Sequence, residues 1–187
     1  ETVRPDIVLF VNGIPFCVIE CKAPQIEVEQ AVSQSIRNQN DDYIPKLFTY
    51  VQMVLALNKN NAMYATTGSA AKFWSVWKEP QREYENLSIF VKQPLPEELI
   101  AKISATFVLE PETFSGDRLV TEQDKALFSL CRPERLLELA WKFTVFDGGL
   151  KKIARYQQYF VVKSILGRVK QYDDTGARKG GMIWHTQ

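Results

Sequence analysis

The sequence has few of the residues that many catalytic and metal sites need. Its 187 residues include one histidine, His185, and three cysteines, Cys17, Cys21 and Cys131. A single histidine at the end of the chain argues against Ser-His or Cys-His catalysis and against a histidine-rich zinc site. The cysteines show no Cys-x-x-Cys spacing, so we expect them to be reduced, mostly buried thiols of a cytosolic protein.

The sequence also lacks a long apolar run and a strong excess of charge. No segment approaches the ~20 apolar residues that cross a bilayer, and no basic-then-apolar signal segment opens the chain, so we expect no membrane partner. The net charge is +1, so any DNA-binding surface would have to be a local patch. Hydrophobic residues make up 45% of the chain, which is typical of a globular protein with its own core.

The first residues predict a β-hairpin. Residues 6–11 (DIVLFV) and 15–22 (PFCVIECK) are rich in β-branched and apolar residues, and Asn12-Gly13 lies between them. Asn-Gly between two such runs is a strong hairpin signal. The two predicted strands therefore lie side by side.

Beyond the hairpin, the chain predicts a mixture of helices and strands. Residues 27–39 have apolar residues at helical spacing, and residues 48–57 are interpreted as a strand, with a buried helix as the alternative. A turn is predicted at 58–61, with strands at 62–67 and 73–77. Helices are predicted at 94–105, from Thr121 and at 133–143, followed by a break at 147–149. The last predictions are a long basic helix at 151–172, a polar turn at 173–179 and the start of a strand at 181–185.

Three charged residues of the predicted hairpin form a candidate catalytic site. Asp6 begins one strand, whereas Glu20 and Lys22 lie two apart on the other and project to the same side of the sheet. Two carboxylates and the backbone carbonyl of Cys21 suit Mg²⁺, a hard cation that prefers oxygen ligands. Lys22 can orient or deprotonate water, or stabilise developing negative charge, so the set suffices for phosphodiester hydrolysis.

A solvated strand face is the alternative interpretation of a Glu-x-Lys pair. Val18-Ile19 and residues 7–11 argue against it, because they are continuous apolar runs typical of strands covered on both sides. The charges then interrupt an otherwise buried element, and buried charges must pair or bind an ion.

With these residues in place, the chain resembles the PD-(D/E)XK nuclease superfamily and, more narrowly, the restriction (R) subunit of type I restriction–modification enzymes. The resemblance runs along nearly the whole chain. It is carried by residues 4–13 (RPDIVLFVNG), 18–22 (VIECK), 44–50 (IPKLFTY) and 180–187 (GGMIWHTQ). It implies an α/β, restriction-endonuclease-like core with a mixed central sheet flanked by helices, followed by a mainly helical segment that leads to a helicase-like motor.

The resemblance implies roles for the candidate residues. Asp6 and Glu20 would be metal ligands and Lys22 the catalytic lysine. Family members carry a Gln-x-x-x-Tyr motif on the next helix, and Gln34 fits its glutamine.

The tyrosine position of that motif falls on Asn38, which departs from the family pattern. Gln39 and Tyr43 give an alternative match. Arg37 lies one helical turn from Gln34 and is a candidate DNA-phosphate contact. A polar helix face is the other interpretation of Gln34 and Arg37.

The C-terminal residues resemble the start of the motor, but they contain no phosphate-binding Gly-x-x-x-x-Gly-Lys loop. ATP is therefore expected to bind the full-length protein only. Arg155-Tyr156-Gln157-Gln158 resembles the motif that contacts adenine in related motors, with Gln158 as the contact or, alternatively, as an exposed helical residue. The basic residues of 151–170 could touch DNA, the motor or only solvent.

Three domains follow from the resemblance. We expect a nuclease core at 1–92, a helical segment at 93–150 and the start of the ATPase motor at 151–187. The chain begins without methionine and in mid-motif, and it stops before the motor loop, so we expect it to be part of a longer protein.

The implied function is Mg²⁺-dependent cutting of unmodified foreign double-stranded DNA, coupled in the full protein to ATP-dependent translocation. The implied partners are methyltransferase and specificity subunits, in a bacterial or archaeal cytoplasm. Two other hypotheses remain. One is a repair or recombination nuclease with the same core, and the other is a DNA-binding or docking domain whose nuclease centre is inactive.

Overall fold

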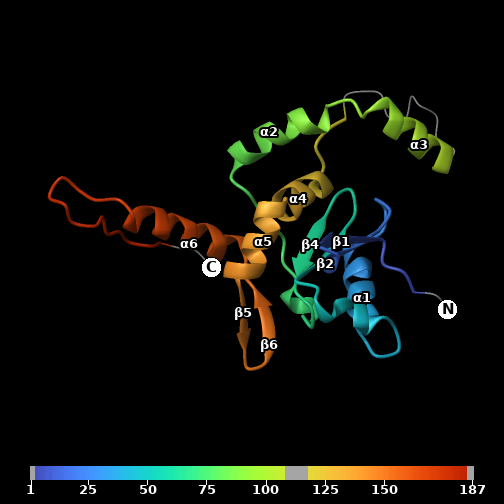
Figure 1. Ribbon diagram of the computed structural model, residues 1–187, viewed down its shortest axis with the longest axis horizontal. Helices are drawn as coiled ribbons and strands as arrows, with labels where there is room; N and C mark the ends of the chain where they lie inside the picture. The colour runs from blue at the N-terminus through green and yellow to red at the C-terminus, as the bar shows by residue number, and fades with distance from the viewer. Residues whose placement is uncertain (1–2, 108–117, 185–187) are drawn as a thin grey trace.

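The computed structural model describes residues 3–107 and 118–184, and a four-stranded mixed sheet lies at its centre (Figure 1). The strands lie in the order β1-β2-β3-β4. β1 pairs antiparallel with β2, β2 parallel with β3, and β3 antiparallel with β4. Their bounds are Ile7–Val11, Ile14–Cys21, Met53–Leu57 and Ala62–Ala65. The α/β class and the mixed sheet predicted from the sequence are confirmed.

The β1–β2 turn follows from its two residues. Asn12 has a φ of 49° and Gly13 a φ of 80°. A two-residue hairpin turn with positive φ at both positions matches the right-handed twist of its strands, and asparagine and glycine adopt this conformation most readily. The predicted hairpin is confirmed, with a bulge between Leu9 and Phe10.

Helix α1 (Val28–Asn38) connects the parallel strands β2 and β3. Its buried residues recur at helical spacing, at Val28, Ala31, Val32 and Ser35. This apolar stripe packs on the sheet face that carries Val18 and Val54. The helix predicted for 27–39 is therefore confirmed, and its other residues remain free to carry polar groups.

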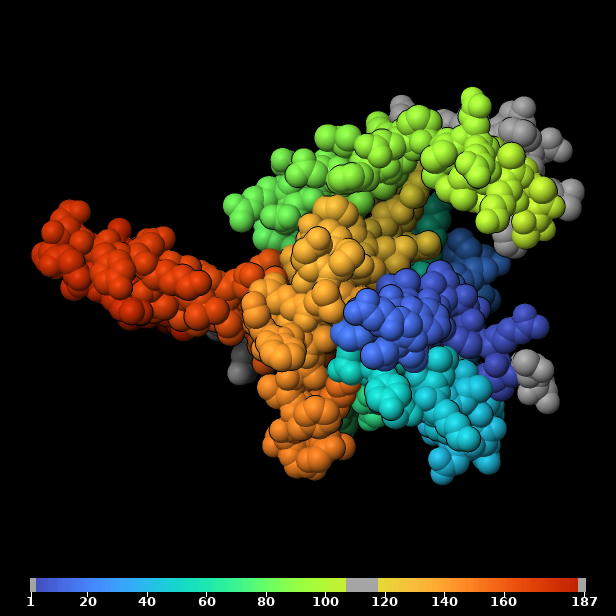
Figure 2. All heavy atoms as spheres, in the orientation of Figure 1, coloured from blue at the N-terminus to red at the C-terminus, as the bar shows by residue number. Residues whose placement is uncertain are grey.

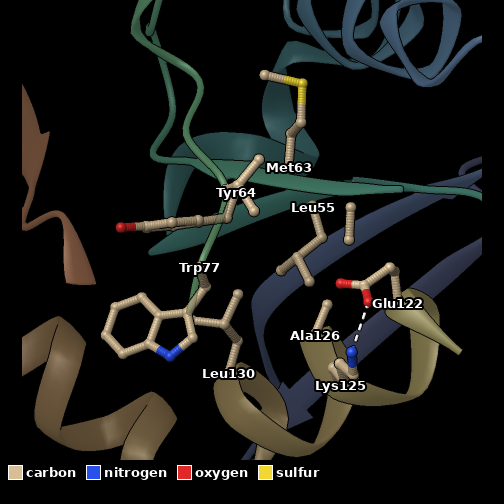
Figure 3. A pocket seen from close by; sticks show the side chains of 10 residues that line it. Leu55, Met63, Tyr64, Trp77, Glu122, Lys125, Ala126 and Leu130 are labelled. Carbon is tan, nitrogen blue, oxygen red and sulfur yellow. Dashed lines mark hydrogen bonds and ion pairs between the residues drawn. The ribbon is translucent and has the colours of Figure 1, made fainter. Parts of the chain in front are cut away.

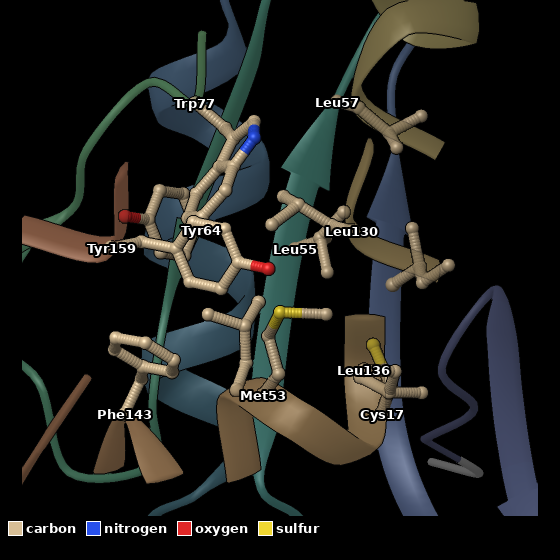
Figure 4. Close-up of a cluster of buried hydrophobic side chains, with 12 residues drawn as sticks. Cys17, Met53, Leu55, Leu57, Tyr64, Trp77, Leu130, Leu136, Phe143 and Tyr159 are labelled. Atoms are coloured by element: carbon tan, nitrogen blue, oxygen red, sulfur yellow. The ribbon is translucent and has the colours of Figure 1, made fainter. Parts of the chain in front are cut away.

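The opposite face of the sheet is covered by helices from the second half of the chain. Met53, Leu55 and Leu57 of β3 pack there against α4 (Glu122–Cys131) and α5 (Pro133–Lys142) (Figure 4). Tyr159 of α6 (Tyr156–Val169) joins the same cluster. Every residue of β3 is buried, as expected for a strand covered on both faces.

The remaining elements lie around this three-layer core. α6 and the loop at residues 170–178 extend away from the rest of the molecule (Figure 2). The other elements are two 3₁₀ helices, two α-helices and a two-stranded hairpin: η1 (Pro45–Thr49), η2 (Ala71–Phe73), α2 (Gln81–Val91), α3 (Glu97–Phe107), β5 (Thr144–Asp147) and β6 (Leu150–Ile153). None of the described helices is long and apolar enough to span a membrane.

Several predicted elements are correct within a few residues. The predicted turn at 58–61 lies directly after β3, and the predicted strand at 62–67 is β4. The helices predicted at 94–105, from Thr121 and at 133–143 are α3, α4 and α5. Thr121 is the N-cap of α4 and forms a capping box with Asp124. This reciprocal pairing of side chains and backbone satisfies the first free N–H groups of the helix.

Other predictions are wrong. Only the second half of 48–57 is a strand, because Pro45 opens η1, which continues to Thr49. Residues 73–77 form no strand beyond an isolated bridge between Ser75 and Tyr64. Trp74 and Trp77 are buried, whereas Phe73 is 57% exposed.

The predicted helix at 151–172 starts late and stops early. Residues 150–153 form β6, and the helix runs only from Tyr156 to Val169. Gly148 and Gly149 both have positive φ and form the turn of the β5–β6 hairpin, which was not predicted. α2 was not predicted either. Gly181–Trp184 form no strand, and His185 lies outside the described residues.

A buried ion pair connects the segment between η2 and α2 to helix α5. Glu79 has a fully buried side chain and pairs with Arg135 of α5, whose side chain is 11% exposed. Glu79 also accepts a hydrogen bond of 2.9 Å from the indole N–H of Trp77. The Arg135 guanidinium lies 4.6 Å from the ring centroid of Tyr159 and 5.4 Å from that of Trp77. Arg135 therefore both neutralises a buried carboxylate and packs on aromatic rings.

We expect Arg135→Ala to lower the free energy of unfolding by about 3–5 kcal/mol, because it leaves the Glu79 carboxylate buried and unpaired. Urea denaturation of the variant and the wild type measures this difference. Arg82→Ala is the matched control, since Arg82 is 81% exposed and lies 3.7 Å from Glu83. That change should alter stability by no more than about 0.5 kcal/mol. Equal effects of the two substitutions would contradict the role assigned to Arg135.

Candidate nuclease site

The candidate site lies where β2 ends, between the N-terminal segment and α1. β2 presents Cys17 and Ile19 to the α4–α5 face of the sheet and Val18 to the α1 face. Because side chains alternate along a strand, Glu20 faces α1 as Val18 does. The sheet pattern therefore carries a carboxylate into the layer between β2 and α1, where it is fully buried.

Two amides of α1 hold the Glu20 carboxylate. Gln34 donates from Nε2 to Glu20 Oε2 at 2.9 Å, and Asn38 donates from Nδ2 to Glu20 Oε1 at 2.8 Å. The two residues are four apart, so they lie on the same face of the helix. Each carboxylate oxygen has one amide donor, which fixes the orientation of the group.

Gln34 also connects Glu20 to Lys22. The Nζ of Lys22 donates to Gln34 Oε1, while the amide nitrogen of Gln34 donates to Glu20. The backbone N–H of Lys22 donates to the carbonyl of Leu57 at 2.9 Å, which holds the residue beside β3. Glu20, Gln34 and Lys22 therefore form one continuous hydrogen-bonded chain.

Asp6 completes the group of charges from the other strand of the hairpin. It lies immediately before β1, and its Oδ2 accepts a hydrogen bond of 2.7 Å from the backbone N–H of Cys21. Burial and, after it, the nearby negative charge of Asp6 together raise the pKa of Glu20 from 4.5 to about 7. Burial and the Asp6 charge also raise the pKa of the Cys21 thiol. The structure thus brings Asp6, Glu20, Lys22 and Gln34 together.

The donor set fits magnesium better than a structural metal site. No group of three or more His, Cys, Asp and Glu side chains is placed to hold a metal within residues 3–107 and 118–184. Mg²⁺ is commonly bound through one or two carboxylates and keeps several waters. Asp6 and Glu20 form such a pair, and their mutual repulsion is the condition that a divalent cation relieves. The predicted ligand role of the Cys21 carbonyl stays a prediction.

Two other predicted site residues lie apart from this group. Arg37 is exposed, and its guanidinium lies 5.3 Å from the ring centroid of Tyr43. Gln158 is exposed at the start of α6, where its Oε1 accepts a hydrogen bond of 2.9 Å from the backbone N–H of Arg155 and caps the helix. The capping contact gives Gln158 a structural role, and adenine binding stays a prediction.

The structure separates the two alternatives for the Gln-x-x-x-Tyr motif. Gln39 donates to the backbone carbonyl of Ser35 and accepts from the N–H of Gly68. Tyr43 is 39% exposed and packs with Arg37. Gln34 and Asn38 are the pair that contacts Glu20. Sequence reasoning noted Asn38 only as a departure, although its spacing of four from Gln34 already placed it on the same helix face.

A small pocket elsewhere contains none of the predicted site residues. It lies between β3, β4 and α4 and is lined mainly by apolar side chains, including Leu55, Tyr64 and Leu130 (Figure 3). Lys125 and Glu122 form an ion pair of 2.6 Å at its lining. The pocket is therefore a seam of the hydrophobic core, and it offers no cluster of catalytic groups.

Comparison with known proteins finds a family match over the first part of the chain. The family described as the type I restriction enzyme R protein N terminus matches residues 1–73. The match contains all four strands of the sheet, α1 and the whole Asp6–Glu20–Lys22–Gln34 group.

Several proteins similar to this chain are endonuclease subunits by name. The chain is 29% identical to the type I restriction enzyme HindI endonuclease subunit of Haemophilus influenzae, over 98% of the chain and 15% of the relative. It is 27% identical to the putative MjaVIIP endonuclease subunit of Methanocaldococcus jannaschii, over 98% of the chain and 15% of the relative. It is 26% identical to the putative MjaVIIIP subunit of the same archaeon, over 100% of the chain and 16% of the relative. The chain thus spans about a sixth of the length of these relatives.

The raised pKa of Glu20 predicts how stability changes with pH in EDTA. The folded protein holds the Glu20 proton more tightly than the unfolded chain, so this contribution to stability is fully present below pH about 4.5. It is lost as the pH rises through about 7. We expect Asp6→Asn to reduce that loss, because it removes the charge and keeps an oxygen for the Cys21 N–H.

Thermal melts at pH 5 and pH 8 measure the effect. At pH 8, Asp6→Asn should melt about 2–4 °C above the wild type, as expected for a gain of about 1 kcal/mol. At pH 5 the difference should be small. Asp174→Asn, an exposed aspartate in the turn after α6, is the control and should change neither midpoint. Parallel pH curves for wild type and Asp6→Asn would show that Asp6 does not act on Glu20.

Proposed function

We propose that the chain carries the Mg²⁺-dependent endonuclease centre of a type I restriction enzyme R subunit. The observation that carries this proposal is the hydrogen-bonded chain from Lys22 through Gln34 to Glu20, with Asp6 beside Glu20. The match of residues 1–73 to the R-protein N-terminal family and the names of the relatives support it. The substrate is double-stranded DNA, and cleavage is coupled in the full protein to ATP-dependent translocation.

The chain's own residues have distinct tasks in phosphodiester hydrolysis. Asp6 and Glu20 supply oxygen ligands, and Gln34 links the Glu20 carboxylate to Lys22. Asp6 and Glu20 would hold a magnesium ion there, which when bound would lower the pKa of bound water and stabilise charge on a phosphate oxygen.

Lys22 donates one N–H to Gln34 and has two more N–H donors for the attacking water or a phosphate oxygen. The water oxygen bonds to phosphorus as one ester P–O bond breaks, and the leaving oxygen keeps that electron pair and takes up a proton in place of the one that the water loses. The buried location of Glu20 strengthens these electrostatic effects, because the local dielectric is low.

We expect partner subunits, and not this site, to supply sequence specificity. Nothing in the sequence resembles a base-reading module, and phosphate contacts alone carry no direct sequence information. We therefore propose that methyltransferase and specificity subunits select the DNA. The division into a nuclease core at 1–92, a helical segment at 93–150 and a motor at 151–187 stays a prediction, although α4, α5 and Tyr159 share the core of the sheet.

Lys22→Ala tests the proposed function in the full-length subunit assembled with its partners. We expect DNA cleavage to fall by about 10²–10⁴-fold, the range for loss of a positioned acid–base group. ATP-driven translocation should be unchanged, because Lys22 contacts only the site. Lys102→Ala, an exposed lysine on α3, is the control and should cut normally. If Lys22→Ala still cleaves DNA at the wild-type rate, the catalytic centre lies elsewhere.

A further inference from the structure

Asn38 holds one oxygen of the Glu20 carboxylate from a fully buried position. Its Nδ2 lies 2.8 Å from Glu20 Oε1, and its side chain is 0% exposed. It is the last residue of α1, and its backbone carbonyl accepts a hydrogen bond of 3.2 Å from the N–H of Ile44. The end of the helix and the following turn therefore fix where the amide points.

The other half of the Asn38 amide has no partner. Its Oδ1 is buried and receives no hydrogen bond from any group in the part of the chain that the structure describes. A buried acceptor without a donor costs free energy, which an apolar side chain of similar shape would avoid. The contact that accounts for an asparagine here is therefore the bond from Nδ2 to Glu20, since the Oδ1 end of the amide makes none.

The two amides of α1 leave the rest of the carboxylate available. A carboxylate has about four lone-pair positions on its two oxygens. Gln34 occupies one on Oε2 and Asn38 one on Oε1, and the Asp6 carboxyl group approaches from the other strand. Groups that hydrogen-bond a metal ligand orient it, and their loss commonly weakens metal binding.

We propose that Asn38 is a positioning residue that holds the Glu20 carboxylate in the orientation needed to bind a divalent cation. The proposal rests on the proposed nuclease function, because it assumes that Glu20 is a ligand. It differs from that function in assigning a role to Asn38, which lies where the family pattern has a tyrosine. Asn38 supplies through a short amide the donor that keeps Glu20 from rotating.

Binding of Mn²⁺ to the full-length subunit tests the proposal without relying on cleavage. Titration without nucleotide, followed by electron paramagnetic resonance of free Mn²⁺, gives the affinity of each variant. Glu20→Ala defines the site, since its binding should be lost. Asn38→Leu keeps the approximate volume but has no N–H, and we expect it to weaken Mn²⁺ binding by about 10–100-fold. Asn38→Ala should weaken it similarly.

Ser35→Ala is the matched control. Ser35 lies on the same helix, is 0% exposed, and its hydroxyl, like Asn38 Oδ1, has no partner among the described groups. It makes no hydrogen bond to Glu20 in this structure, so Ser35→Ala should bind Mn²⁺ as the wild type does. Weaker binding by both Asn38 variants and not by Ser35→Ala supports the proposal.

Thermal melts in EDTA show whether each variant still folds without a bound metal. Wild-type Mn²⁺ affinity in Asn38→Leu overturns the proposal, even if its melting midpoint falls. If Glu20→Ala still loses binding in that case, the proposed nuclease site stands. Wild-type affinity in Glu20→Ala removes the metal site itself and the inference with it. The two failures are therefore distinguishable.

Discussion

The burial of the Glu20 carboxylate is the constraint on which the rest of the site depends. A carboxylate that leaves water must find donors or take up a proton. Glu20 does both in part, since Gln34 and Asn38 donate to its oxygens while burial and Asp6 raise its pKa to about 7. The position of α1 is therefore as important to the chemistry as the acidic residues, because α1 supplies both donors.

The two faces of the sheet pack against different parts of the chain. Odd-numbered residues of β2, Cys17 and Ile19, pack against α4 and α5, whereas Val18 and Glu20 face α1. The helices of the second half of the chain thus stabilise the sheet from the side opposite the site. Parallel pairing of β2 with β3 requires a crossover, and α1 is that crossover. The same connection that closes the sheet brings the two amides to the end of β2.

The parts of the fold that the sequence predicts are those set by local chemistry. Asn12-Gly13 specifies the hairpin, and that hairpin alone brings Asp6 near Glu20. The errors lie where tertiary packing decides. The strands of the β5–β6 hairpin have four residues each, too few for a period to show, so their glycine turn was interpreted as the end of a helix. The contact of Asn38 depends on how closely α1 packs on β2, which no sequence pattern gives.

That close packing explains how a short amide can reach Glu20. The buried face of α1 consists of small or medium side chains, among them Ala31 and Ser35, both 0% exposed. Small residues allow a helix to approach the sheet, and a closer helix brings Asn38 Nδ2 to 2.8 Å from the carboxylate. The small side chains of the α1 face therefore let the short Asn38 amide contact the carboxylate, because the helix backbone lies close to β2.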